Sequence, residues 1–134
     1  MRKIMIVDDN YLSAEGIEKN IDWEVLNAEI VHICYNGTSA IDAMKKEPVD
    51  LIISDIEMPD LDGISMSRQA LDINPMVKII LISAYDKFEY ASMIDEMKQK
   101  ENLTINLHVC GRRLRKIESA FFFTRLLRKL KMSD

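Results

Sequence analysis

Short apolar segments alternate with helix-like segments over the first 83 residues. The strand-like segments are Lys3–Val7, Ala28–Tyr35, Asp50–Ser54 and Val77–Ile82. They are rich in Ile and Val, and the last is almost continuously apolar, as expected of a strand buried on both faces. Because strands and helices alternate with short connections, the sequence predicts an α/β fold. In such a fold, right-handed crossovers place helices on both faces of a parallel sheet.

Turn residues mark where the intervening helices begin and end. The first helix is predicted from Tyr11 to about Asn20, with an apolar face of Leu12, Ala14 and Ile17. Thr38 or Ser39 is the predicted cap of the second helix, which ends before Pro48. A third helix is predicted from about Gly63 to Ile73.

The size of the chain and its apolar runs limit the class of protein. With 134 residues, it is long enough for one domain with a buried core. Its longest apolar runs are far shorter than the roughly 20 residues that span a bilayer, and its start is too short for a signal peptide. We therefore expect a cytoplasmic protein without a membrane partner. Cys34 and Cys110 have no CxxC spacing, which favours reduced, structural thiols.

Polar residues stand at the carboxyl ends of three predicted strands. Asp8 and Asp9 end the first, Asp55 follows the third, and Ser83 follows the fourth. In parallel α/β sheets, ligands bind beyond the carboxyl ends of the strands, near the switch in strand order. If these strands are neighbours, three carboxylates and a hydroxyl converge there. Taken alone, Asp8 and Asp9 have a second interpretation, as acidic residues that complement a helix dipole.

Such a cluster has a definite chemistry. Close carboxylates repel one another, and an oxygen-only set of ligands favours Mg²⁺. A carboxylate can also act as a nucleophile and form an acyl phosphate. The Ser83 hydroxyl can donate a hydrogen bond to a phosphoryl oxygen, while Mg²⁺ offsets part of the negative charge.

Three motifs follow one another in the chain: Val7-Asp8-Asp9, Ser54–Gly63 and Leu81–Ala84. Together they resemble the receiver domain of two-component response regulators. Ile21–Glu24 and Ser83–Ala91 are similar to receivers that precede AraC-type helix-turn-helix domains in bacterial transcription regulators. The resemblance covers residues 1 to about 91. It implies a flavodoxin-like, doubly wound, five-stranded parallel sheet of order 2-1-3-4-5 with helices on both faces.

The resemblance also implies a function for the acidic cluster. Asp55 would accept phosphate from the phosphohistidine of a sensor histidine kinase, to regulate an output such as transcription. Asp9 and Asp55 would ligate Mg²⁺ with the backbone carbonyl of Glu57, and Asp8 would help through water. Ser83, with Ala84, would bind the phosphoryl group as the switch.

Further roles are implied for the surrounding loops. Pro59 and Gly63 would shape the loop after Asp55. Glu57 and Tyr85 would influence how long the phosphate lasts. Receivers also often pair, so a homodimer is an expected assembly. Contact with DNA would require an output domain that is absent from this chain.

The last third of the sequence departs from the family pattern. The family lysine, about 22 residues after the switch hydroxyl, falls on Ile105. The strand-like run Leu103–Val109 ends in Cys110-Gly111 instead of Lys-Pro, and no matching lysine is found. Arg112 or Arg113 is the alternative source of a cation. We therefore interpret the chain as one receiver domain, family-like over 1–91 and with a divergent last βα unit over 92–134.

Charge changes along with the pattern. Residues 1–90 hold 8 of the 18 Lys and Arg but 17 of the 22 Asp and Glu. Residues 112–131 instead predict a basic helix with an apolar side. A helix packed on the sheet, a helix that docks a partner or dimerises, and a nucleic-acid patch are its three interpretations. The abrupt change also raises the hypothesis of a truncated or frame-shifted gene product.

Two other functions remain open on the sequence alone. A degenerate receiver could serve only as a binding or dimerisation module, since the lysine is missing. A Mg²⁺-dependent phosphatase could use Glu57 as a general acid, although no insertion is long enough for a substrate-covering cap. The first hypothesis remains a phosphoacceptor that is not a turnover enzyme on an external substrate, although it could hydrolyse its own aspartyl phosphate.

Overall fold

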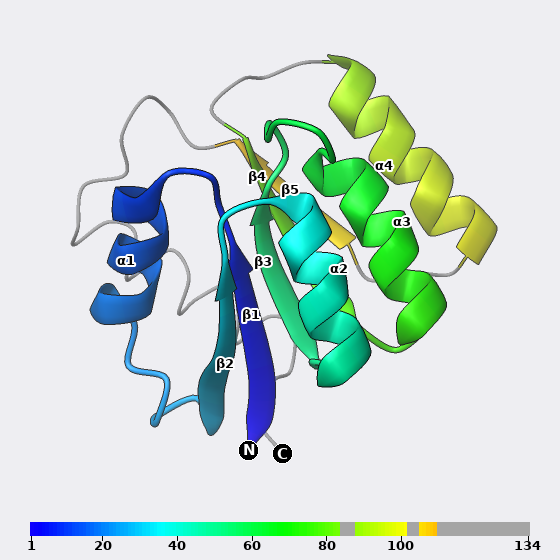
Figure 1. Ribbon diagram of the computed structural model, residues 1–134. Coiled ribbons are helices and arrows are strands. Elements are labelled where there is room, and N and C mark those ends of the chain that lie inside the picture. The colour runs from blue at the N-terminus through cyan, green and yellow to red at the C-terminus, as the bar shows by residue number, and fades with distance from the viewer. Residues whose placement is uncertain (84–87, 102–104, 110–134) are drawn as a thin grey trace.

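Strands and helices alternate through the computed structural model, which describes residues 1–83, 88–101 and 105–109 (Figure 1). The strands are β1 (Arg2–Val7), β2 (Ala28–Cys34), β3 (Leu51–Asp55), β4 (Lys78–Ser83) and β5 (Ile105–Val109). The helices are α1 (Tyr11–Asn20), α2 (Gly37–Lys46), α3 (Gly63–Ile73) and α4 (Phe88–Glu101). The predicted alternation is confirmed.

All five described strands pair in parallel, in the order β2-β1-β3-β4-β5. This is the strand order that the resemblance implied. The register aligns Val7 with Ser54, and Asp55 with Ile82. The carboxyl ends of β1, β3 and β4 therefore meet at one edge of the sheet.

Helices cover both faces of the sheet, each over its own apolar core (Figure 1). Side chains of a strand alternate between faces, so Ile4 and Ile6 pack with α1 while Met5 and Val7 pack on the other side. Helices α2, α3 and α4 contribute to that second core. Residues 51–53 and 79–81 are fully buried, which explains their nearly unbroken apolar sequence.

Two details of the predicted helices are wrong. The cap of α2 is Asn36, whose side chain accepts a hydrogen bond from the Ser39 N–H at 2.7 Å, and not Thr38 or Ser39. The cap must precede the helix, and Ser39 supplies a donor that needs capping. Leu12 is 78% exposed, because it lies in the first turn of α1 on the side away from the sheet; Ala14 and Ile17 are buried as predicted.

Several predictions fall on residues that are not described. Ala84, Tyr85 and Cys110 lie outside the described residues, as does the basic helix predicted over 112–131. The described part of the predicted fifth strand is β5, and the assignment of one domain over 1–134 stays a prediction. In the described segments, every helix is too short or too polar to cross a bilayer.

Candidate functional site

Three aspartates meet at the carboxyl edge of the sheet. Asp8 and Asp9 follow the last residue of β1, and Asp55 is the last residue of β3. One carboxylate oxygen from each lies within 4.8 Å of the others. Asp9 is exposed, whereas Asp8 and Asp55 are half-buried. The convergence expected from the strand ends is therefore present for the carboxylates.

The turn between β1 and α1 holds Asp8 in place. Asp8 Oδ1 accepts a hydrogen bond from the Asn10 N–H at 2.9 Å. The side chain of Asn10 in turn caps α1 and accepts hydrogen bonds from the N–H groups of Leu12 and Ser13, at 3.0 and 3.2 Å. The first turn of α1 contains no acidic residue. Asp8 and Asp9 thus lie just before the cap and outside the helix, and their interpretation as dipole-complementing residues stays a prediction.

The backbone around Asp55 is fixed by its neighbours. The Ser54 hydroxyl donates to the Asp55 carbonyl oxygen at 2.9 Å, and the Ile56 N–H donates to the Ile82 carbonyl at 2.9 Å. The backbone N–H groups of Glu57 and Ile56 lie close enough to the Asp55 carboxylate to lower its pKa. Asp55 is thus held both by the sheet and by the loop that follows it.

Gly63 lies directly against this backbone. Its N–H donates to the Ile56 carbonyl at 2.8 Å, and a Cβ at this position would lie 2.3 Å from the Asp55 carbonyl oxygen. Ser67, fully buried, donates its hydroxyl hydrogen bond to the Gly63 carbonyl at 2.6 Å. The start of α3 can approach the end of β3 this closely only without a side chain at position 63.

A tight turn closes the loop between β3 and α3. The Leu61 N–H donates to the Pro59 carbonyl at 2.8 Å, and Asp60 between them has a φ of 67°. Left-handed backbone is uncommon for residues other than glycine, although Asp and Asn tolerate it best. Leu61 then packs over the start of α2, where a Cβ on Gly37 would lie 2.5 Å from the Leu61 carbonyl oxygen.

The electrostatics of the cluster favour a bound cation. Burial, followed by the charge of Asp8, raises the pKa of Asp55 to about 7 against the lowering effect of its backbone hydrogen bonds. Burial also raises the pKa of Asp8 to about 6. Protons therefore compete for this site near neutral pH. Because every ligand atom is a carboxylate oxygen, the residues present fit Mg²⁺.

The basic side chains in residues 1–83 lie away from the acidic cluster along the sequence. Those on strands stand at the starts of β1 and β4, opposite the carboxyl edge: Arg2, Lys3 and Lys78. The others are on helices, mostly in the last turns: Lys19, Lys45, Lys46 and Arg68. Within this part of the chain, no basic residue belongs to the loops at the carboxyl edge.

Ser83 is the last residue of β4 and is fully buried. Its strand lies next to β3, with Asp55 paired to the preceding residue, Ile82. The spacing from Ser83 had placed the expected lysine at Ile105. The structure corrects this position, because Ile105 begins β5 and pairs with Ile79, at the end of the strand remote from the aspartates. Residue spacing fails here because it ignores the lengths of α4 and of the loop that follows it. The residue of β5 that pairs with Ser83 is Val109.

Two residues that support the site were missed from the sequence. Asn10 stands directly before the first helix, where a capping residue is expected. Its capping role could therefore have been predicted from the sequence. Ser54 is a single hydroxyl inside an otherwise apolar strand, yet it is fully buried. Its role depends on a hydrogen bond to the next residue's carbonyl, which no periodicity indicates.

Comparison with known proteins gives a consistent result. The model of the response regulator receiver domain family matches residues 4–104. The uncharacterized transcriptional regulatory protein YesN of Bacillus subtilis is 31% identical over 91 residues, which are 68% of this chain and 25% of YesN. The transcriptional regulatory protein HptR of Staphylococcus aureus is 30% identical over 92 residues, 67% of this chain and 35% of HptR. The match thus spans about a quarter to a third of these relatives.

Solved structures show the same architecture. The REC domain of AraT, a response regulator from Geobacillus stearothermophilus, superposes with a TM-score of 0.74 at 26% identity, covering 97% of this chain and 95% of that one. The response regulator domain of Thermotoga maritima CheB gives a TM-score of 0.78 at 20% identity, covering 100% and 98%. At that identity, the second likeness supports the fold alone.

Proposed function

Because the chain belongs to the response regulator receiver domain family, we propose that it accepts a phosphoryl group on Asp55 within a two-component phosphorelay. The observation that carries this proposal is the convergence of three carboxylates at the end of β3 and β1. The donor is the phosphohistidine of a sensor histidine kinase. The phosphorus–nitrogen bond breaks, the histidine nitrogen keeps the electron pair, and a phosphorus–oxygen bond forms to Asp55.

Mg²⁺ is the proposed cofactor of this reaction. Asp9, Asp55 and the backbone carbonyl of Glu57 would hold it, with Asp8 acting through water. When bound, the ion would offset negative charge at a place where residues 1–83 supply no basic side chain from the loops at the carboxyl edge. The hydrogen bond from the Asn10 N–H orients Asp8, and the loop hydrogen bonds orient Asp55.

The remaining site roles follow the family pattern and are part of the proposal. Ser83 and Ala84 bind the phosphoryl oxygens and report on them, while Glu57 and Tyr85 influence the lifetime of the aspartyl phosphate. Pro59 and Gly63 shape the loop, a role supported for Gly63 by its contact with the Asp55 backbone. Hydrolysis of its own aspartyl phosphate by the protein is also part of the proposal.

The output is proposed from the relatives. Several are named transcriptional regulators and are longer than the matched region. We therefore propose that phosphorylation in the cytoplasm regulates transcription through a DNA-binding output domain, and that two receivers can pair. Receiver domains are generally not turnover enzymes on external substrates, which removes the support for an external phosphatase.

Acetyl phosphate tests the central step. In the presence of Mg²⁺, the purified protein is expected to gain one hydroxylamine-sensitive phosphoryl group, localised by peptide mass spectrometry to Asp55. Beryllofluoride with Mg²⁺ should bind the same site. Neither reaction requires the cognate kinase.

A degenerate binding module is the second candidate function. It is favoured by one observation: at the level of Ser83, the described end of β5 offers Val109 and no cation. Under this alternative, Mg²⁺ still binds the carboxylates but acetyl phosphate leaves Asp55 unmodified. Labelling with Mg²⁺ present therefore separates the two functions.

Mg²⁺ affinity should increase with pH. Because the pKa of Asp8 is about 6 and that of Asp55 about 7, protons must leave before the metal binds. We expect the Kd for Mg²⁺ to fall by about tenfold or more between pH 6 and pH 8, with proton release on binding. Isothermal titration calorimetry in buffers of different ionisation enthalpy measures both. A Kd that stays constant over this range would show that these carboxyl groups do not exchange protons for metal.

A further inference from the structure

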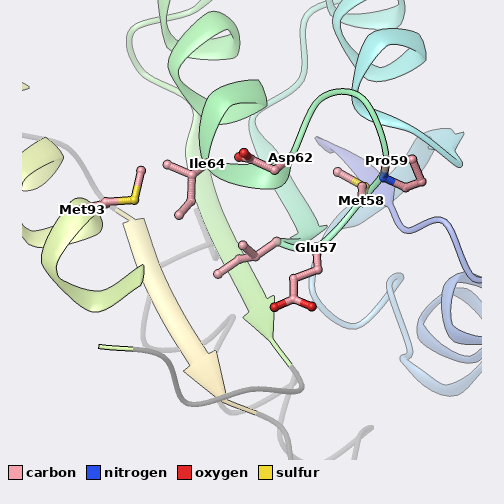
Figure 2. A pocket seen from close by; sticks show the side chains of 7 residues that line it. Glu57, Met58, Pro59, Asp62, Ile64 and Met93 are labelled. Atoms are coloured by element: carbon pink, nitrogen blue, oxygen red, sulfur yellow. The ribbon is translucent and has the colours of Figure 1, made fainter. Parts of the chain in front are cut away.

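A cavity of about 370 Å³ lies beside the loop that follows Asp55 (Figure 2). Most of its lining is apolar and comes from five side chains: Ile56, Met58, Pro59, Ile64 and Met93. Two acidic residues, Glu57 and Asp62, complete the lining. This volume is at the lower end of the range for small-molecule sites in proteins, about 300–1,000 Å³.

The cavity lies between two segments that continue from the functional strands. Residues 56–62 connect β3, which ends at Asp55, to α3. Met93 belongs to α4, which follows β4 in the chain. Figure 2 shows Met93 on one side of the cavity and the β3–α3 loop on the other, with Ile64 of α3 between them. The acidic cluster is a separate feature, and none of its carboxylates lines this cavity.

Asp62 is held in a fixed position at the rim. Its Oδ1 accepts the Ser65 N–H at 2.8 Å and its Oδ2 accepts the Ser65 hydroxyl at 3.4 Å, so it caps α3. The side chain is exposed, and its carboxylate adds negative charge to a mostly apolar wall. Anions are therefore disfavoured, and a ligand with an apolar body and a cationic head is complementary to the lining.

Two methionines make the apolar wall adaptable. Met58 is buried and Met93 is half-buried. Methionine has an unbranched, flexible side chain, and its sulfur makes favourable contacts with aromatic rings. A ligand with a flat aromatic or alkyl body can therefore be accommodated without moving the backbone.

We propose that this cavity binds a small organic cation of the arylalkylguanidinium type. The apolar body packs against Met58, Ile64 and Met93. The guanidinium group interacts with the carboxylate of Asp62 at the rim. Such a site is additional to the phosphoacceptor function and does not depend on phosphorylation of Asp55.

A matched pair of probes tests the chemistry. 2-Phenylethylguanidinium and 2-phenylethylurea have nearly the same shape, and only the first is charged. Both are titrated into the full chain with saturating Mg²⁺, which occupies the acidic cluster, while backbone amide shifts are followed by NMR. The guanidinium is expected to bind with shifts centred on residues 56–64 and 92–94, about tenfold more tightly than the urea.

Substitutions locate the site. Asp62→Asn removes the charge while keeping a good helix cap, and should weaken guanidinium binding by about three- to tenfold. Asp72→Asn, at the exposed far end of the same helix, is the charge-matched control and should leave binding unchanged. Met93→Lys places a positive charge in the cavity wall and should abolish binding, whereas Met93→Leu should retain it.

Four results would overturn the proposal. Equal affinity for the two probes would show that charge plays no part. An equal effect of Asp72→Asn would indicate general attraction to an acidic surface. Shifts centred on Asp8 and Asp9 would place the cation at the metal site instead. Binding of a capped arginine dipeptide without binding of the free probe would assign the cavity to a polypeptide partner.

Discussion

Asp55→Asn should reduce phosphorylation by acetyl phosphate to background. The amide lacks the nucleophilic oxygen that forms the acyl phosphate, and nearby Asp8 and Asp9 are not held at the end of β3. The measurement is intact-protein mass spectrometry after incubation with acetyl phosphate and Mg²⁺. Asp42→Asn, at an exposed position on α2, makes the same chemical change away from the site and should label normally.

The same variant should be more stable than the native protein at pH 8 without Mg²⁺. The folded-state pKa of Asp55, about 7, lies above its ordinary value of 3.8, so the folded protein binds this proton more tightly than the unfolded chain does. The free energy of unfolding therefore falls as pH rises from about 4 to about 7. Above pH 7 the native protein bears the whole destabilisation that the charge of Asp55 causes. Allowing for solvent screening at this half-buried carboxyl group, removing the charge should contribute about 1–2 kcal/mol.

These two readouts make the result interpretable. Urea denaturation at pH 8 and at pH 4 measures the free energy of unfolding, and the difference between variants should vanish at the lower pH. A variant that is stable but unlabelled has lost the acceptor and not the fold. Persistent labelling of Asp55→Asn at the native level would place the phosphoryl acceptor elsewhere and refute the assignment.

Gly63→Ala should damage both stability and metal binding. The new Cβ would lie 2.3 Å from the Asp55 carbonyl oxygen and 2.9 Å from the Ile56 Cα, and backbone atoms in a sheet cannot move away cheaply. We expect a loss of about 2–4 kcal/mol in the free energy of unfolding. Because the displaced backbone carries Asp55, Mg²⁺ should also bind about tenfold or more weakly at the same pH.

Gly16→Ala provides the matched control for this substitution. Gly16 is inside α1, where a Cβ would meet only the Asn20 Nδ2 at 3.9 Å, an ordinary contact. Alanine favours the helix over glycine, so this variant should gain about 0.5–1 kcal/mol and keep its Mg²⁺ affinity. Comparable stability and Mg²⁺ affinity in Gly63→Ala and the native protein would mean that α3 can shift without disturbing Asp55.

The order and type of the elements could be predicted because local patterns encode them. Residues 51–53 and 79–81 are apolar without interruption, and only strands covered on both faces require this. Which side chains of a helix's first turn are buried was harder to predict from the sequence. Leu12 lies two positions before Ala14 and five before Ile17, spacings that place it on the other side of the helix, so it is exposed although it is apolar.

The candidate site was predictable to the level of its carboxylates. Asp8, Asp9 and Asp55 stand directly after apolar strands, and parallel strands bring such positions to one edge. The position of the expected lysine was not predictable by spacing, because Ile105 lies at the start of β5. Counting residues cannot give a strand's register when a helix and a loop of unknown length intervene.

The sequence by itself determined the α/β alternation and the identity of the residues that end each strand. Both follow from periodicity and from residue type, which act over a few neighbours. Only the tertiary structure decided how the backbone around Asp55 is held, because Gly63 and Ile82 reach it from other segments of the chain. It also decided the raised pKa of Asp55, since burial and the charge of Asp8 depend on strands that are far apart in the chain.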